Sequence, residues 1–334
     1  MPNCLLLGKV KPWNRRQFLK LGLAGAGITS AAIALQTLKP QHQSLVRVPP
    51  LPKDAVVAGS SVNPMQVLRD FDYGTVKREN GRTIREFRIV AGTSTIQLNS
   101  AVSFDTWNFN GRIPGPTLRA TQGDRIRILF LNKGGHAHSM HFHGIHPAAV
   151  DGVRPVSDGA ATIYEFDAEP FGVHPYHCHT APIARHIGKG LYGMFIIDPP
   201  QARPPADEMV LVMAGYDVNE DKRNEFYAFN GQPDYYMMHP IPIYQNQLIR
   251  LYILNMIELD PVATFHLHAN FFRVYPTGMT LTPSQETDVI TMGTAERHIL
   301  EFSYRHPGKY MFHPHQDALA EAGCMGHFEV IPQA

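Results

Sequence analysis

The sequence predicts an all-β protein made of two consecutive β-sandwich domains. Its 334 residues, at about 150 residues per domain, leave room for two domains. It has 27 Pro and 27 Gly but few long apolar-periodic runs, which favours short strands and turns over helices. One series of motifs also occurs twice, at a spacing of roughly 130 residues, which indicates a duplicated domain rather than a short-repeat solenoid.

Four segments are expected to be strands at corresponding places in the two copies. Residues 125–131 and 248–254 alternate in polarity for part of their length and are bounded by turns. Residues 192–199 and 326–332 match as final strands, and a proline stops each of them. No long amphipathic helix is expected, so two sandwiches are the natural architecture.

Composition and charge narrow the class of protein. Hydrophobic residues make up 44% of the chain and charged residues 18%, as in ordinary globular proteins. The 30 Lys and Arg nearly balance the 29 Asp and Glu, so nucleic acid is not an expected partner. Three Cys cannot form a disulfide framework, whereas 18 His is an unusually high count.

The N-terminus is similar to a bacterial twin-arginine export signal. Arg15-Arg16 precedes Phe18-Leu19-Lys20, and a weakly apolar Gly/Ala-rich stretch follows over residues 21–35. That stretch is shorter than the roughly 20 residues that span a bilayer, although an uncleaved anchor is the alternative. We therefore expect use of the twin-arginine export machinery and a periplasmic or extracytoplasmic location.

The histidines occur in four His-x-His pairs, two in each copy. Side chains at i and i+2 on a strand point to the same face, so each pair aims two imidazoles at one point. The pairs begin at His141, His177, His266 and His313. Eight imidazoles from two domains are expected to converge in a cleft between domains, although imidazole by itself suits Cu, Zn, Fe and Ni.

Cys178 identifies the expected metal as copper. It lies between His177 and His179, so its sulfur points to the opposite side of the strand. A thiolate with two imidazoles is the donor set of a blue-copper electron-transfer site, and His138 and His186 are available for it. This layout places an electron-collecting copper on one side of the strand and a polynuclear cluster on the other.

These motifs resemble those of two-domain multicopper oxidases of the cupredoxin superfamily, which are laccase- and ceruloplasmin-like and related to copper nitrite reductases. Residues 107–119, followed by Gly123-Asp124, are similar to that family's opening motif, and residues 138–144 resemble the copper segment of ceruloplasmin. The similarity runs from about residue 85 to the end of the chain. It implies two consecutive cupredoxin-like Greek-key sandwiches, at 85–200 and 206–334, after a signal peptide and tail (1–40) and a linker or N-terminal extension (41–84).

The resemblance implies four coppers per chain and a role for each ligand. It assigns His138, Cys178 and His186 to type 1 copper, His141 and His266 to type 2 copper, and His143, His177, His179, His268, His313 and His315 to the type 3 pair. Pro314 stands where a second blue site would need Cys, so only the first domain is expected to accept electrons. The implied activity is dioxygen reduction to water, driven by a reductant that is phenolic, a metal ion or a redox protein.

Two positions near these ligands stay open. The axial position of the type 1 copper falls on Leu191 by family spacing, with Met194 as the rival. A non-coordinating Leu191 would raise the copper's potential. Asp151 resembles the family's proton-relaying acid, although an Asp-Gly turn explains it equally well. Asp317 and Glu321 are weaker candidates for the same role.

The remaining histidines and sulfur-containing residues have simpler interpretations. His136, His146, His174, His239 and His298 are expected to be surface or hydrogen-bonded residues. Cys324 is expected to be a small buried residue, and Met237-Met238 is expected to pack in a core or loop rather than bind cuprous ion.

Two other functions compete with oxygen reduction. Copper nitrite reductases share the two-domain plan, but they carry Asp where this chain has His141, and they lack the imidazole of His179. A non-enzymatic copper-binding scaffold is the other alternative, but degenerate scaffolds lose ligands and none is lost here. The resemblance further implies a homotrimer, in which the first domain of one chain meets the second domain of the next.

Overall fold

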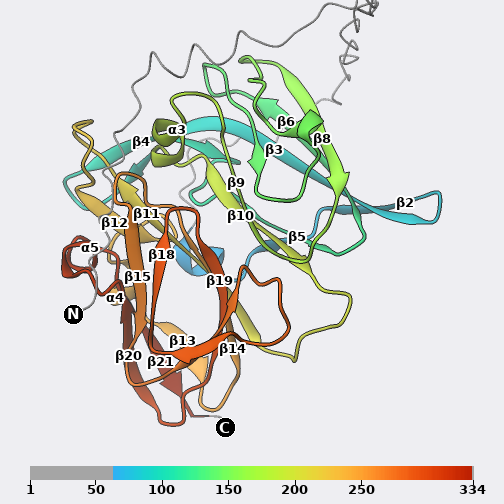
Figure 1. Ribbon diagram of the computed structural model, residues 1–334. Coiled ribbons are helices and arrows are strands. Elements are labelled where there is room, and N and C mark those ends of the chain that lie inside the picture. The colour runs from blue at the N-terminus through green and yellow to red at the C-terminus, as the bar shows by residue number, and fades with distance from the viewer. Residues whose placement is uncertain (1–62, 333–334) are drawn as a thin grey trace, which may run out of the picture. The chain divides into compact units, whose positions relative to one another are not determined.

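The computed structural model describes residues 63–332 (Figure 1). The predicted signal peptide and tail (1–40) and the first part of the predicted linker (41–62) lie outside these residues. Within 63–332, none of the helices combines the length and hydrophobicity that crossing a bilayer requires.

The first half of the described chain folds into two sheets. One sheet has the order β1 (Phe71–Asp72), β5 (Thr117–Thr121), β10 (Tyr192–Asp198), β9 (Gly172–His177) and β7 (His141–Phe142). The other has the order β2 (Thr75–Glu79), β3 (Arg82–Gln97), β6 (Arg125–Asn132) and β8 (Ala161–Asp167), with β4 (Ser103–Phe109) paired to β3. Apolar side chains from both sheets form one buried core, in which Phe87 of β3 meets Phe195 of β10 edge to face.

The second half repeats the two-sheet plan. Its larger sheet has the order β12 (Phe226–Phe229), β11 (Asp207–Tyr216), β14 (Ile249–Asn255), β19 (Arg297–Phe302), β16 (Phe272–Pro276) and β17 (Gln285–Thr287). The other has the order β13 (Ile241–Tyr244), β21 (Gly326–Ile331), β20 (Gly308–His313), β15 (Val262–Leu267) and β18 (Val289–Gly293). Leu251, Leu300, Phe265 and Phe312 share the core between these sheets. The predicted all-β class with cupredoxin-like sandwiches is confirmed.

The four predicted strands are present as β6, β14, β10 and β21, with ends shifted by about one residue from the prediction. The helices are short, as expected: α2 (Pro64–Val67), η2 (Ala148–Val150), α3 (Ile183–Gly188), α4 (Tyr235–Met238) and α5 (Asp317–Glu321). Of these, α3 matters most for function because it carries His186.

Residues 63–72, in the predicted N-terminal extension, contact both halves. The Tyr236 hydroxyl donates to the Pro64 carbonyl at 2.7 Å, and Arg69 pairs with Asp207 at 2.8 Å. Immediately afterwards, β1 runs parallel to β5. This stretch therefore ties the two halves together.

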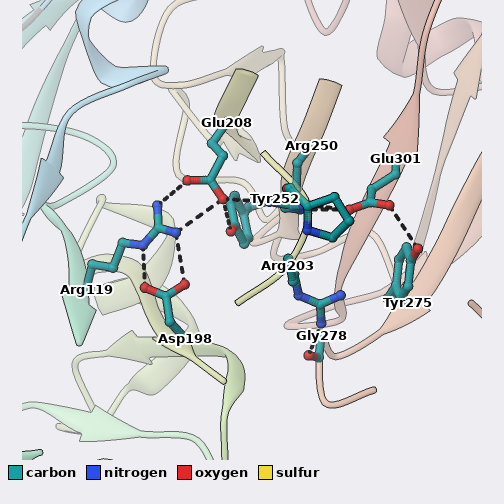
Figure 2. A network of polar contacts seen from close by, with 10 residues as sticks. Arg119, Asp198, Arg203, Glu208, Arg250, Tyr252, Tyr275, Gly278 and Glu301 are labelled. Carbon is teal, nitrogen blue, oxygen red and sulfur yellow. Dashed lines mark hydrogen bonds and ion pairs between the residues drawn. The ribbon is translucent and has the colours of Figure 1, made fainter. Parts of the chain in front are cut away.

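A buried ionic network also joins the halves (Figure 2). Arg119 of β5 pairs with Asp198 of β10 at 2.8 Å and with Glu208 of β11 at 2.7 Å. Arg250 of β14 continues the network to Glu208 at 3.1 Å and to Glu301 at 2.7 Å. An apolar layer containing Val173, Ile196, Val210 and Leu254 packs beside it between the two halves.

Candidate metal centres

Strand register brings the His-x-His pairs together in each domain. In the first domain, His141 on β7 lies opposite His177 on β9. In the second, His266 on β15 lies opposite His313 on β20. The same antiparallel pairing therefore places equivalent imidazoles side by side in both copies of the module.

In each domain, the first residue of the first of the two His-x-His pairs named above is held by an aspartate. His141 Nδ1 lies 2.8 Å from the Asp151 carbonyl oxygen and 3.1 Å from its Oδ1. His266 Nδ1 lies 2.8 Å from the Asp288 carbonyl oxygen and 3.8 Å from its Oδ2. These contacts occupy Nδ1 as a donor and leave Nε2 free to bind a metal. Asp288 was not predicted, since it lies 22 residues after His266 whereas Asp151 lies 10 after His141.

The next imidazoles meet through their Nε2 atoms. His143 Nε2 lies 2.9 Å from His177 Nε2, and His268 Nε2 lies 3.0 Å from His313 Nε2. His177 and His313 each direct Nδ1 toward a backbone carbonyl, at 2.9 and 2.7 Å. In each pair, two Nε2 atoms face each other. A metal ion bound between them would give both nitrogens a partner.

The fourth imidazole of each group lies beside the first imidazole of that group. The ring centroid of His179 is 4.9 Å from that of His141, and the ring centroid of His315 is 5.3 Å from that of His266. Among the residues described, each group of imidazoles close enough to share an ion draws on one domain only. One chain therefore holds two groups of four and does not by itself join all eight.

Burial keeps two imidazoles of the first group, those of His143 and His177, in the neutral form. Burial, and after it the neighbouring His177 and His141, lower the pKa of His143 to about 3. Burial likewise lowers the pKa of His177 to about 4. These imidazoles are unprotonated at neutral pH and ready to bind a metal. In the second group burial also lowers the pKa of His268 and of His313, although His268 and His315 are solvent-exposed.

The predicted type 1 residues converge on the opposite side of Cys178. Its Sγ lies 3.2 Å from His186 Nδ1 and 3.7 Å from His138 Nδ1, and the two nitrogens are 3.2 Å apart. The centre of this triangle is about 2 Å from all three atoms, close to ordinary metal–ligand bond lengths. One thiolate and two imidazoles at this spacing fit copper, and the Ser139 amide donates to the sulfur at 3.4 Å.

The two candidates for the axial position face different cores. Leu191 is fully buried in the core that contains Cys178, and its carbonyl accepts the Cys178 amide at 3.0 Å. Met194 points to the other face of β10, where it packs with Val210 and Val212 of the second domain. This geometry favours Leu191 as the apolar neighbour of the thiolate.

A layer of aromatic rings covers the type 1 group. The Trp107 ring lies 4.8 Å from His186 and 4.3 Å from His136, and His136 lies 4.2 Å from His138. His136 Nε2 is buried and has no hydrogen-bond partner among residues 63–332. His136 as a whole is partly exposed, so the expectation that it is a surface or hydrogen-bonded residue rather than a ligand stays a prediction. Its His-x-His spacing to His138 is the sequence signal for the closeness of these two rings.

Asp151 is linked to a further histidine. His146 Nε2 lies 3.3 Å from Asp151 Oδ1, the same oxygen that approaches His141. The adjoining Gly152 has φ +78°, and a Cβ there would lie 2.0 Å from the Met140 carbonyl oxygen, so only glycine fits this turn. Asp151 is therefore both part of an Asp-Gly turn and a partner of a cluster imidazole. The weaker candidates Asp317 and Glu321 are exposed on α5.

The remaining residues fall outside the two groups. His174 is buried and lies 3.0 Å from the carbonyls of His143 and Pro170, as a hydrogen-bonded histidine should. His298 is buried, and its Nε2 lies 3.3 Å from a Glu296 carboxylate oxygen. Cys324 is fully buried in the second core, as expected.

We expect Gly134→Ala to lower the copper affinity of the type 1 site. The backbone at Gly134 is not in the left-handed region, so alanine adds no backbone strain. A Cβ at this position would lie 2.3 Å from His138 Nε2, so the imidazole must move. Copper affinity at this site should fall by roughly 10- to 100-fold, as for lost outer-sphere support, measured by copper titration of the blue absorption. Gly188→Ala is the matched control because a Cβ there meets no atom within 4 Å. Equal affinities for the two variants would contradict the prediction.

We also expect copper-free protein to lose stability between pH 7 and pH 5. Burial lowers the pKa of His138 and His143 to about 3 and of His174, His177 and His186 to about 4. Below pH 6.5 the unfolded chain therefore takes up protons that the folded chain does not, and stability falls with pH. The melting temperature should drop by about 10 °C or more, measured by scanning calorimetry. Asp and Glu stay largely ionised between pH 7 and pH 5. A melting temperature that does not change over this range would therefore show that these imidazoles titrate normally.

Comparison with known proteins agrees with this arrangement. Two multicopper oxidase family models match, one over residues 91–202 and the other over residues 202–334. A solved multicopper oxidase is 48% identical with a TM-score of 0.80, and the match covers 81% of this chain and 97% of that one.

Nitrite reductases are also similar to this chain. The copper-containing nitrite reductase of Neisseria meningitidis (serogroup A) is 25% identical over 305 residues, or 83% of this chain and 75% of that protein. The solved copper nitrite reductase of Nitrosomonas europaea is 25% identical with a TM-score of 0.69, covering 74% of this chain and 94% of that one. With both halves matched by its models, the chain belongs to the multicopper oxidase family.

Proposed function

We propose that this copper oxidoreductase takes single electrons from a reductant at a type 1 copper and uses four of them to reduce dioxygen to water at a trinuclear copper cluster. The observation that carries the proposal is the segment 177–179. The Cys178 sulfur contacts His186, whereas the flanking His177 and His179 rings lie 5.2 and 4.9 Å from His141. Adjacent residues thus serve both candidate centres, and a short covalent path joins them.

Different residues of this chain have different roles in the proposed reaction. Copper, when bound, supplies one-electron redox chemistry at the type 1 site and oxygen-reducing chemistry at the cluster. His138, Cys178 and His186 would hold the first copper, with Leu191 as an apolar neighbour of the thiolate. The eight imidazoles would hold the other three coppers, and Asp151 fixes the ring of His141 while offering a carboxylate for proton transfer.

We propose a homotrimer, because one chain separates its two groups of imidazoles. His268 and His315 are exposed. Three apolar residues that are near the second histidine group in sequence or by strand pairing are also exposed: Val262 (41% of its surface), Phe271 (59%) and Val289 (37%). Such a surface is suited to burial against another subunit. A first-domain group from one chain facing a second-domain group from the next would close a three-fold ring. Light scattering should give a trimer, and a monomer that keeps all its copper would refute this.

The direct test is copper content together with oxygen consumption. Copper-reconstituted protein should hold four coppers per chain, and oxygen uptake with hexacyanoferrate(II) should rise in proportion to copper loading. Two coppers per chain would indicate one type 1 and one type 2 copper and would reject the trinuclear cluster. Oxygen uptake that is independent of copper loading would reject the oxidase proposal.

Nitrite reduction is the second candidate, because several of the similar proteins are named copper nitrite reductases. His141 and His179 both lie in the first-domain group, and a complete second group of four imidazoles is also present. A single type 2 copper would not use all of these imidazoles. Nitrite turnover above that of a copper-free control, without oxygen uptake, would favour this candidate. A non-enzymatic copper-binding role would be favoured by full copper loading without either turnover.

We also propose export by the twin-arginine route to an extracytoplasmic site. The support is the Arg15-Arg16 motif and the short apolar stretch that follows it. Fractionation of cells producing the full chain should recover the protein outside the cytoplasm. Arg15→Lys combined with Arg16→Lys should retain it inside, and unchanged export would contradict the proposal.

A further inference from the structure

A cavity lies along the interdomain linker, residues 199–206, which joins β10 of the first domain to β11 of the second. It measures about 430 Å³, within the range of about 300–1,000 Å³ that is common for small-molecule sites. Side chains from β5, β11 and β14 complete its wall, so both domains contribute to it. Five charged residues line the cavity: Arg119, Arg203, Arg250, Asp198 and Glu208. The charged lining therefore has a net charge of +1.

Both carboxylates are already held by the ionic network that joins the halves (Figure 2). Asp198 accepts two hydrogen bonds from Arg119, at 2.8 and 2.9 Å. Glu208 accepts from Arg119 at 2.7 Å and from the Tyr252 hydroxyl at 2.7 Å. Glu208 also accepts from Arg250 at 3.1 Å. Neither carboxylate is therefore available to neutralise a third guanidinium.

Arg203 is this third guanidinium, and no carboxylate of residues 63–332 forms an ion pair with it. Its Nη2 donates to the carbonyls of Gly278 and Thr280, at 2.8 and 2.6 Å, and the side chain extends toward Gly278 (Figure 2). A guanidinium has five N–H donors, so the three on Nε and Nη1 have no acceptor in the described chain. Neither of these two nitrogens is sealed from solvent. Burial lowers the pKa of Arg203, as it does for a half-buried cation without a counter-ion.

Uncharged donors also line the cavity. The Thr121 hydroxyl makes no hydrogen bond within residues 63–332, and the backbone amides of Ala202 and Ala206 donate to none of these residues. Donors without acceptors, beside a guanidinium without a counter-ion, are the features that bind an oxyanion. A cation would be repelled by the excess positive charge, and an apolar ligand would leave these donors without acceptors.

We propose that this cavity binds a small tetrahedral oxyanion, with inorganic phosphate as the one to test. Arg203 supplies the charge, and the Thr121 hydroxyl and the linker amides supply further hydrogen bonds. Thr121 belongs to the first domain, whereas Arg203 is attached to the second domain through Gly278 and Thr280. A bound oxyanion therefore contacts both sides of the junction between the domains and stabilises the folded chain in which they are joined.

The first test is calorimetric titration of the full-length, copper-loaded protein with inorganic phosphate, with sodium chloride at equal ionic strength as the blank. Wild type should bind phosphate in a saturable manner. Ala202→Asp places a carboxylate at an exposed position of the lining and should weaken binding by at least about tenfold through like-charge repulsion. Ala202→Asn has a similar shape without the charge and should bind as wild type does. Absence of saturable binding to wild type, or equal binding by the two variants, as for phosphate held at copper, would overturn the proposal.

A second pair of variants tests the guanidinium. Arg203→Gln removes the charge but keeps an amide that can donate to the carbonyls of Gly278 and Thr280, and it should weaken phosphate binding by about tenfold or more. Arg305→Gln, the same replacement at an exposed position of the second domain outside the cavity, should bind as wild type does. Equal phosphate affinities of these two variants would contradict the role of Arg203.

The melting temperature gives an independent measure of the same site. Compared with chloride at equal ionic strength, phosphate should raise the melting temperature of wild type and of Ala202→Asn more than that of Ala202→Asp. An equal rise in all three proteins would assign the effect to the general action of phosphate on protein surfaces and would reject this cavity as the site. Neither measurement involves turnover, so both results are independent of the proposed oxidase function.

Discussion

Replacing Cys178 by serine is expected to abolish the blue absorption and to remove one copper per chain. A hydroxyl cannot replace a thiolate as a soft donor between His138 and His186. Loss of a second-sphere partner alone costs about 10- to 100-fold in metal affinity or activity, so loss of this ligand should reduce oxygen uptake by at least about a hundredfold. Visible absorption, copper analysis and oxygen-electrode rates measure the three effects.

The matched control is Cys324→Ser, because Cys324 is equally buried but lies in the core of the second domain. It should lose some stability and keep the blue absorption. If both variants keep the absorption, the thiolate is not the source of the colour. The assignment of the type 1 site to the first domain would then fail.

Arg250→Met is expected to destabilise the protein by about 3–5 kcal/mol, the usual cost of removing one partner of a buried ion pair. The Arg250 and Glu301 side chains are both 3% exposed and approach to 2.7 Å (Figure 2). The substitution also removes the contact to Glu208 at 3.1 Å and the hydrogen bond to the Pro204 carbonyl at 2.7 Å. Urea unfolding of copper-free protein measures the change.

Arg185→Met is the control for this prediction. Its pair with Glu220 is 53% and 55% exposed, so its loss should change stability by no more than about 1 kcal/mol. The double variant Arg250→Met/Glu301→Leu should recover part of the loss, because it no longer leaves a carboxylate buried without its main partner. If Arg250→Met and Arg185→Met lowered the free energy of unfolding by similar amounts, the buried network would contribute little to the stability of the contact between the two halves.

Local patterns were sufficient for the strands and for the four His-x-His pairs. The strands β6, β10, β14 and β21 were predictable because alternation and terminal prolines act within a few residues. The His-x-His pairs were informative for the same reason, since a two-residue period places both rings on one face of a strand. The position of Cys178 between two histidines then separated the two candidate centres.

Contacts between distant segments escaped prediction. Asp288 reaches His266, and Trp107 with His136 covers His138 and His186, through packing that no local period records. The network from Arg119 to Glu301 draws its members from strands of both domains. Each partner is an ordinary charged residue in the sequence, and its importance comes only from burial beside the others.

What the sequence determines and what only the folded chain determines differ in how far apart the interacting residues lie along the chain. The amino-acid order was enough to predict a duplicated β module, to assign it to its family by resemblance and to identify the imidazole and thiolate donors, because strand periodicity and ligand chemistry are properties of neighbouring residues. The folded chain was needed to separate the eight imidazoles into two groups, to orient Leu191 and Met194 to different cores, and to form a cavity along the interdomain linker. Those features arise where sheets pack against each other, and packing brings together residues that are far apart in the chain.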